Sequence, residues 1–354
     1  MKKLRIAQVA PLWFTVPPKG YGGIERVIKL LCDGLVDRGH DVTLFASPGS
    51  DTKARLVSVY DAPLIEAGII WSNPIWNLRN IQKAVEEGNR GGFDVIHMHM
   101  DLWGLFAHGV SKAPVVHTMH NPLYRTNADA SKNDRLRLFR EEAEQTNVAF
   151  ISEAARHSSM VELPKGRVVY NGVDLAHFRF GEGGDHFIWI ARVNKHKGIE
   201  NAIEAAERLG ARLTLAGRID PTQQEYFDTA IKPRLNDRIT FIGELMQDQL
   251  PGFYGSATAL LYPIEWDEPF GLVVAEAMTC GTPVVAYDRG SMKELIEDGV
   301  SGYVTPRDDL DAFVEAMRKA GALDRKAVRA HVERRFSAER MTEGYEKFYN
   351  DILA

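Results

Sequence analysis

Cysteine is scarce in this sequence, and long apolar runs are absent. Of 354 residues only Cys32 and Cys280 are cysteines, too few for a disulfide framework or a cysteine-rich zinc site. No run approaches the roughly 20 apolar residues that a membrane span needs. The first residues lead directly into a strand pattern, without the apolar segment of a secretory signal. We therefore expect a cytoplasmic protein.

Basic residues do not predominate either. The 43 Lys and Arg against 48 Asp and Glu give a net charge of −5. Nucleic-acid-binding proteins usually carry a basic face, so we expect no nucleic-acid partner. No strongly basic amphipathic helix is evident, so peripheral membrane contact is possible but unsupported. The length suits two domains rather than one.

Short β-rich runs alternate with helical patterns along the whole chain. The run 4–10 precedes a helix whose apolar residues recur at helical spacing from Ile24 to Leu35. A second series begins at Phe187–Ile190, followed by a predicted helix over 198–209. The remaining predicted strands are 41–45, 94–98, 114–118, 148–151, 212–216, 239–242, 259–262 and 284–286. Because parallel strands need crossover connections, this alternation predicts two doubly wound α/β domains.

A glycine-rich linker over 173–185 separates the two series. In doubly wound sheets a ligand lies at the carboxyl ends of the strands. We therefore expect the two domains to face each other across a cleft that holds the site.

Two groups of residues at predicted strand ends point to an anionic ligand. The loop with Gly20, Gly22 and Gly23 lets backbone approach a ligand before a helix begins, although a tight turn without a ligand explains it about as well. It matches neither the dinucleotide fingerprint nor the P-loop. Arg192 and Lys197 follow the first strand of the second series and could neutralise a diphosphate. A solvated cationic turn is the alternative.

The most specific group is the stretch from Glu268 to Glu276, with Pro269 and Gly271 between them. Glu276 falls on a predicted buried helix, where an unpaired carboxylate would be costly, so a ribose diol is a fitting partner. The spacing along a helix places the two carboxylates within about 12 Å of each other, comparable to the reach of a nucleotide sugar. Two purely structural carboxylates are the alternative.

Histidines gather near two strand ends: His97, His99, His117 and His120. They suggest a metal, but neither cysteine nor carboxylate completes a ligand set, so we expect no metal. The sequence Asp309-Leu310-Asp311 has the form of a metal–diphosphate motif. Because it precedes a predicted helix, we interpret it as helix capping.

Taken together, these residues resemble family 4 of the retaining glycosyltransferases, also called group 1, which have the GT-B fold. The resemblance covers essentially the whole chain and is carried by the glycine loop, the Arg192/Lys197 pair, the Glu268/Glu276 pair and three short runs: Asp94-Val95-Ile96-His97, Thr118-Met119-His120 and Asn171-Gly172-Val173-Asp174. The loop over 16–24 is most similar to the avilamycin-type antibiotic glycosyltransferases.

The resemblance implies a role for each part of the chain. Residues 1–172, together with a final helix over 337–354, would form an acceptor-binding Rossmann-like domain, and 173–336 the donor-binding one. His120 would lie beneath the anomeric centre, with Glu268, Arg192 and Lys197 as the other catalytic residues. The expected donor contacts are Gly22, Gly23, Arg192, Lys197, Ile242, Gly243, Leu245, Glu268, Phe270, Gly271, Leu272 and Glu276. The expected acceptor contacts are His97, His99, Asn121 and Tyr124.

The function implied is transfer of a hexosyl group from a nucleoside diphosphate sugar, with UDP favoured, to a hydroxyl of a saccharide, lipid-linked or small-molecule acceptor. It would proceed with retention, without a metal and without a cofactor. A nucleotide-sugar 2-epimerase on the same fold is one alternative. A catalytically inactive nucleotide-sugar-binding protein is another, and the missing fingerprint disfavours a nicotinamide oxidoreductase.

Overall fold

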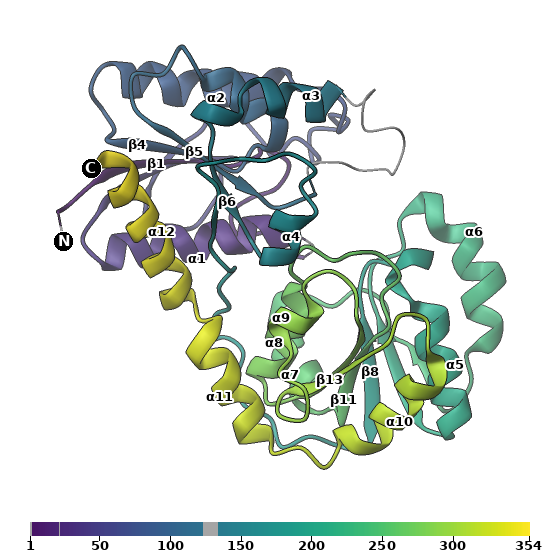
Figure 1. Ribbon diagram of the computed structural model, residues 1–354. Helices are drawn as coiled ribbons and strands as arrows, with labels where there is room; N and C mark the ends of the chain where they lie inside the picture. The colour runs from purple at the N-terminus through teal and green to yellow at the C-terminus, as the bar shows by residue number, and fades with distance from the viewer. Residues whose placement is uncertain (1, 21, 123–133) are drawn as a thin grey trace. The chain divides into compact units, whose positions relative to one another are not determined.

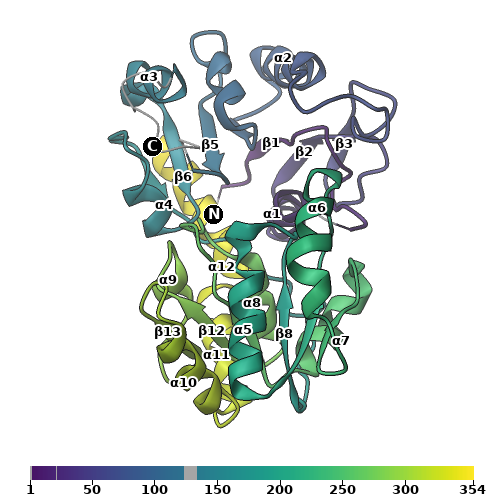
Figure 2. The same cartoon turned by 90° about the vertical axis from the view of Figure 1, so that its right-hand side faces the viewer.

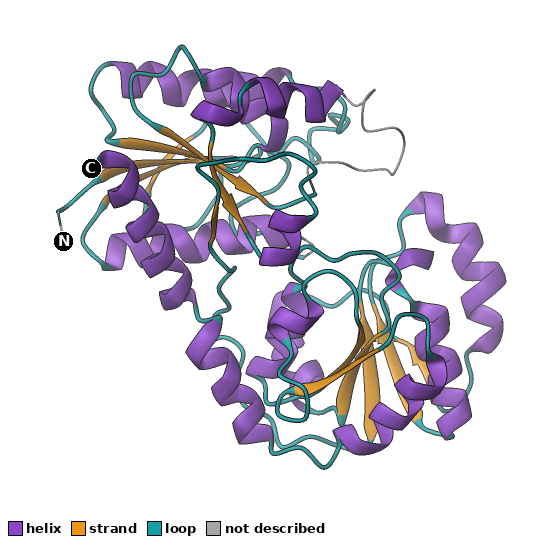
Figure 3. Cartoon of the chain, viewed as in Figure 1, coloured by secondary structure: helices purple, strands orange, loops and turns teal. Residues whose placement is uncertain are grey.

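The computed structural model describes residues 2–20, 22–122 and 134–354. Two compact units emerge: unit 1 comprises Met1–Gly172 with Ala338–Ala354, and unit 2 comprises Val173–Ser337. Each is a parallel sheet covered by helices on both faces (Figure 3). Among the described residues, no helix combines the length and apolar character needed to cross a membrane.

Unit 1 contains a seven-stranded parallel sheet in the order β3-β2-β1-β4-β5-β6-β7. Its strands are β1 (Arg5–Val9), β2 (Asp41–Phe45), β3 (Arg55–Val57), β4 (Val95–Met98), β5 (Val115–Met119), β6 (Asn147–Phe150) and β7 (Arg167–Val168). Its α-helices are α1 (Gly23–Asp37), α2 (Ile75–Asn89), α3 (Asp134–Glu141), α4 (Glu153–His157) and α12 (Ala338–Leu353), with 3-10 turns at η1 (Asp101–Ala107) and η3 (Ala143–Gln145).

The C-terminal helix α12 is an integral part of unit 1. It lies with α1 on one face of the sheet, while α2 covers the other (Figures 1 and 2). The two helices pack closely, because a Cβ at Gly34 of α1 would come within 2.4 Å of the Thr342 hydroxyl. Buried Glu346 of α12 also pairs with Arg38 and His40, just beyond α1.

Unit 2 contains a six-stranded parallel sheet in the order β10-β9-β8-β11-β12-β13. Its strands are β8 (His186–Ile190), β9 (Arg212–Ala216), β10 (Ile239–Phe241), β11 (Ala259–Tyr262), β12 (Val284–Tyr287) and β13 (Gly302–Thr305). Its α-helices are α5 (Ile199–Leu209), α6 (Gln224–Tyr226), α7 (Leu250–Gly255), α8 (Leu272–Thr279), α9 (Met292–Leu295), α10 (Leu310–Ala320) and α11 (Arg325–Arg335).

Short 3-10 and π turns complete unit 2. They are η4 (Lys195–Lys197), η5 (Pro221–Gln223), η6 (Phe227–Ile231, a π turn), η7 (Lys232–Arg234) and η8 (Gln247–Gln249). Helices α5 and α10 cover one face of the sheet, where their apolar sides join the buried core, and α8 lies on the opposite face (Figures 1 and 2). The strand order, which reverses beside β8, is that of a doubly wound sheet.

The sequence boundaries and the structural ones nearly coincide. The expected switch from one half to the other falls at residue 173, and unit 2 extends one residue beyond the expected 336, to Ser337. Asp309 caps α10 by accepting a hydrogen bond from the amide of Ala312 at 2.9 Å, so the capping interpretation of that acidic pair is confirmed.

Candidate active site

Several of the predicted donor residues lie in loops or turns that follow the carboxyl ends of the strands of unit 2. Arg192 follows β8, Lys197 lies in η4, Ile242 and Gly243 follow β10, and Glu268 follows β11. In a parallel sheet these ends share one edge, which is why residues far apart in sequence meet there. The backbones of these loops pack tightly, since a Cβ on left-handed Gly198 would lie 1.8 Å from the carbonyl oxygen of Pro263.

Glu268 is the centre of a compact cluster. Its Oε2 accepts hydrogen bonds from the Lys197 ammonium at 2.8 Å, the Tyr262 hydroxyl at 2.8 Å and the Trp266 indole at 3.2 Å. The Lys197 ammonium also lies 4.6 Å from the centre of the Trp266 ring. No described residue donates to the other oxygen, Oε1. One carboxylate oxygen is thus held by the protein, while the other is free to receive a ligand hydroxyl.

Two of these partners, Tyr262 and Trp266, were not predicted from the sequence. Tyr262 ends the apolar run of β11 and reads as a core residue, and no spacing rule singles out Trp266. Burial and the nearby Glu268 carboxylate hold the pKa of the Tyr262 hydroxyl well above its usual range, so it acts as a hydrogen-bond donor at every ordinary pH.

A second arginine, Arg218, lies beside Arg192 and shares its carboxylate partner. Arg192 lies 3.5 Å from Asp220, and the same carboxylate holds Arg218, which follows β9, at 3.2 Å. The side chains of Arg192 and Arg218 are 45% and 42% exposed, so both guanidinium groups face solvent while sharing one anion. Arg218 was not predicted, although its place after a strand of the second series was a usable signal.

Helix α8 supplies the remaining predicted donor residues. Gly271 is its N-cap in a left-handed conformation, with no side-chain cap, and Leu272 is its first residue. Amides at such a helix start favour an anion. Phe270 is buried and packs edge-on against Phe336, so its side chain belongs to the core.

Glu276 lies one turn further along α8 and is buried, as the sequence predicts. The hydroxyl of Tyr254, in α7, donates to its Oε2 at 2.9 Å. Two other expected donor contacts differ in exposure: Ile242 is 48% exposed, whereas Leu245 is partly buried. Gly243 has a positive φ with open space around its Cα, which leaves room beside the backbone.

In unit 1 the sheet divides the predicted histidine group. His97, His99 and His120 lie on the face that carries α12, while His117 points to the other face and meets His108 at 2.9 Å. No three His, Cys, Asp or Glu side chains within the described ranges 2–20, 22–122 and 134–354 converge as metal ligands do.

His120 directly follows β5 and is partly exposed, with its Nε2 2.9 Å from the Nδ1 of His99. Burial lowers the pKa of His120 to about 3, so its imidazole is neutral at ordinary pH. Asn121 is exposed beside it. Tyr124 lies outside the described residues.

The expected acceptor contacts of His97 and His99 are not compatible with their surroundings. His97 is fully buried, with Nδ1 bonded to Tyr349 and Nε2 to Thr118. His99 is 3% exposed, and its two nitrogens are bonded to His120 and Gln8. Neither imidazole has a nitrogen left for a ligand, because neighbouring side chains of the protein already bond both nitrogens of each ring.

Gly22 and Gly23 begin α1, with Gly22 at φ 145° as the N-cap. A Cβ on Gly22 would lie 2.6 Å from Pro18 and 2.9 Å from the carboxylate of Glu25. Glu25 was not predicted; it is buried in the first turn of α1, and burial raises the pKa of its carboxyl to about 7. Only glycine therefore fits this tight loop.

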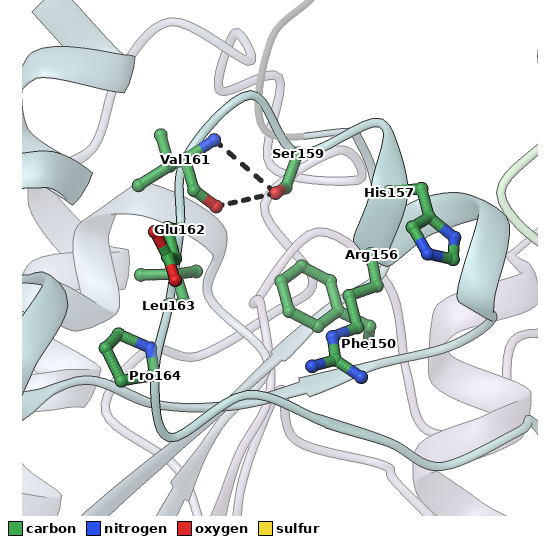
Figure 4. A pocket seen from close by; sticks show the side chains of 8 residues that line it. All are labelled: Phe150, Arg156, His157, Ser159, Val161, Glu162, Leu163 and Pro164. Atoms are coloured by element: carbon green, nitrogen blue, oxygen red, sulfur yellow. Dashed lines mark hydrogen bonds between the residues drawn. The ribbon is translucent and has the colours of Figure 1, made fainter.

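A separate pocket of about 430 Å³ lies near the end of β6 in unit 1 (Figure 4). It includes Arg156 and Glu162, and Ser159 closes its loop by bonding to Val161. None of the predicted site residues lines it. We therefore do not assign this pocket to the candidate active site.

Comparison with known proteins identifies both units. Residues 21–177 match the model of Glycosyltransferase Family 4, and 176–334 that of Glycosyl transferases group 1. The D-inositol 3-phosphate glycosyltransferase of Frankia alni is 31% identical over 368 residues, covering 90% of this chain and 88% of that protein. The phosphatidyl-myo-inositol mannosyltransferase of Mycolicibacterium smegmatis is 26% identical over 360 residues, covering 93% and 89%.

Solved structures agree. AviGT4, a glycosyltransferase involved in avilamycin A biosynthesis, superposes with a TM-score of 0.73 at 26% identity, over 99% of this chain and 98% of that one. Anabaena Alr3699/HepE, solved in complex with UDP-glucose, has the same fold, with a TM-score of 0.75 at 18% identity over 98% and 100% of the two chains. This chain belongs to the group 1 glycosyltransferases and has the GT-B fold.

Proposed function

We propose that this glycosyltransferase moves a hexosyl group from a nucleoside diphosphate sugar, with UDP as the first candidate, to a hydroxyl acceptor. In this proposal the anomeric configuration is retained and neither metal nor cofactor takes part. The observation that carries it is the Glu268 cluster, in which one oxygen is fixed by Lys197, Tyr262 and Trp266 while Oε1 stays available for a sugar hydroxyl.

The diphosphate would be held by groups around this cluster. Arg192, Lys197 and the first amides of α8 supply positive charge and hydrogen-bond donors at the carboxyl edge of the sheet. A preorganised donor aimed at developing charge is typically worth about 10²–10³ in rate. Glu276 would accept hydrogen bonds from the ribose, sharing its carboxylate with Tyr254.

The reaction itself needs no protein nucleophile in this scheme. The bond from the anomeric carbon to the diphosphate oxygen breaks, and a bond to the acceptor oxygen forms on the same face. The acceptor proton passes to an oxygen of the departing diphosphate, so charge and atoms balance. The residues named here contribute by stabilising the leaving group and holding the sugar.

The acceptor is not fixed by family membership. The relatives' names include a mannosyltransferase of phosphatidyl-myo-inositol, glycosyltransferases of D-inositol 3-phosphate and a glycogen synthase, whose acceptors are chemically unlike. Exposed Asn121, beside His120, is the acceptor contact that we retain.

The test is a calorimetric panel of UDP, GDP, dTDP and ADP with their common sugar conjugates, with and without EDTA. We expect selective binding of one nucleotide, unaffected by EDTA. Binding to none of them would refute the donor site, and binding only with added metal would refute metal independence. NMR of the glycoside formed from the selected donor should show the donor's anomeric configuration. An epimeric sugar formed without acceptor would instead identify a 2-epimerase.

A further inference from the structure

Seven side chains on the α12 face of the unit 1 sheet form one continuous hydrogen-bonded row. In order they are His120, His99, Gln8, Tyr349, His97, Thr118 and Tyr345. The successive distances are 2.9, 2.8, 3.0, 2.7, 2.6 and 2.8 Å. The row begins at the carboxyl end of β5 and crosses β4 and β1 to Tyr349 of α12. It then returns through His97 of β4 to Thr118 of β5 and ends at Tyr345 of α12.

The row is sealed from water except at His120. The other six members are each no more than 3% exposed. Burial lowers the pKa of His97 and His99 well below the usual range of histidine, and raises that of Tyr349 well above the usual range of tyrosine. All three histidines are therefore neutral at ordinary pH. Each neutral imidazole has one N–H donor and one acceptor nitrogen.

Neutral imidazoles make the row directional. A neutral imidazole that donates through one nitrogen must accept through the other, so the sense of one bond determines the next. The amide of Gln8 is the asymmetric member. Its NH₂ group donates to Tyr349, and its carbonyl oxygen faces the Nε2 of His99. His99 must then carry its proton on Nε2 and accept at Nδ1.

The consequence falls on His120. Because Nδ1 of His99 accepts, Nε2 of His120 is the donor across the 2.9 Å contact. The remaining nitrogen of His120, Nδ1, then carries a lone pair. It has no hydrogen-bond partner in the part of the chain that the structure describes, and it is not among the buried unpaired atoms. Solvent or a ligand can therefore reach it.

We propose that Gln8 and Tyr349 are positioning residues that fix His120 as the Nε2–H tautomer, so that its Nδ1 accepts a hydrogen bond from a hydroxyl of the donor sugar. The sugar contact rests on the proposed function, whereas the tautomer does not. Helix α12 thereby acts on the site from the far end of the sequence. If either positioning residue is replaced, His120 stays in place, but its proton is no longer confined to Nε2 and both tautomers become populated.

The tautomer can be measured directly by long-range ¹H–¹⁵N NMR on the full chain labelled at histidine, without any substrate. In the unmodified protein we expect His120 to be a single Nε2–H tautomer. Gln8→Leu and Tyr349→Phe should each produce a mixture of the two tautomers. Tyr345→Phe removes a hydroxyl from the same helix at the end of the row, and should leave His120 unchanged. This variant is the matched control.

Three outcomes would overturn the proposal. They are an Nδ1–H tautomer in the unmodified protein, an unchanged tautomer in both Gln8→Leu and Tyr349→Phe, or mixing in the Tyr345→Phe control. Having two positioning variants protects the test if Gln8→Leu fails to fold.

Measurements of donor affinity test the contact between His120 and the sugar separately from the tautomer. If half of the molecules adopt the wrong tautomer, the apparent affinity for the donor sugar nucleotide should fall about twofold, because only the competent fraction binds fully. Affinity for the nucleoside diphosphate without the sugar should not change. Mixed tautomers with unchanged sugar-nucleotide affinity would refute the sugar contact, while absence of any nucleotide binding would refute the proposed function instead.

Discussion

Variants of the ion pair between Lys197 and Glu268 can show whether Lys197 acts in catalysis or only stabilises the fold. Their side chains are 20% and 13% exposed, and the 2.8 Å contact is one of three that Glu268 Oε2 accepts. Lys197→Met keeps the length of the side chain but leaves a largely buried carboxylate with two neutral donors, Tyr262 and Trp266. Removing one partner of a fully buried pair costs about 3–5 kcal/mol. With two donors remaining, we expect a loss of about 1–3 kcal/mol.

Catalysis should respond more strongly than folding. If Lys197 stabilises the departing diphosphate, Lys197→Met should lower kcat/KM by about 10²–10³, as the loss of a preorganised electrostatic contact does. The double variant Lys197→Met/Glu268→Gln removes the unpaired charge as well, so most of the lost stability should return. Activity should not return with it.

The assays are chemical unfolding and steady-state transfer on the same preparations. Lys195→Met is the matched control, since Lys195 lies in the same turn and is exposed. We expect it to behave as the unmodified protein in both assays. A double variant that regains activity together with stability would show that the pair is only structural. So would a single variant within threefold of normal activity, and either result would refute the donor-site assignment.

Four further perturbations follow from the structure. Acidification should destabilise unit 1, because burial lowers the pKa of His117 and His120 to about 3, whereas histidine in the unfolded chain has a pKa near 6.5. The free energy of unfolding should therefore decrease as the pH falls from 6.5 to 3. Between pH 7 and pH 5 the decrease should be about 2 kcal/mol per histidine. Denaturant midpoints that stay flat over that range would contradict this. Arg325→Ala should cost about 2–4 kcal/mol in unfolding experiments, because the guanidinium binds the carbonyls of Gly181, Ala257 and Gly255 and the hydroxyl of Thr282; Arg318→Ala, at an exposed position, is the control. Gly290→Ala would place a Cβ 2.2 Å from the carbonyl oxygen of Glu268 and should impair transfer, whereas Gly299→Ala, equally left-handed but with open space, should not. Glu276→Ala should chiefly weaken donor binding measured by calorimetry, and an unchanged affinity would remove Glu276 from the ribose role.

The sequence predicted the centre of each sheet better than its edges. Strands made mostly of apolar residues, such as β4 and β11, were identified because both of their faces are buried. The edge strands β3, β7 and β13 were missed. Both β3 and β7 are short and largely exposed. The buried ends of β13 are a glycine and a threonine, and its two middle residues are only partly buried, so the apolar signal is weak. Pairing with a neighbouring strand is what makes them strands.

Helix α2 was missed for a different reason. Its buried side includes Asn77 and Asn80, which interrupt the apolar periodicity. Both are there to satisfy backbone groups at the end of β1: Asn77 accepts from the amide of Leu12 at 2.9 Å, and Asn80 donates to the carbonyl of Ala10 at 3.0 Å. A buried polar residue with a fixed partner cannot be told from a surface residue in one sequence.

The same distinction explains which part of the site was predictable. Arg192, Lys197 and Glu268 each follow a strand of the parallel sheet, so the topology alone brings them to one edge. The role of His97 could not be found this way, because it depends on which side chain covers that face of the sheet. Tyr349 lies 252 positions away and supplies that cover. A histidine on a strand therefore indicates a ligand contact only when no other element of the fold already binds both of its nitrogens, and at His120 one nitrogen is still open.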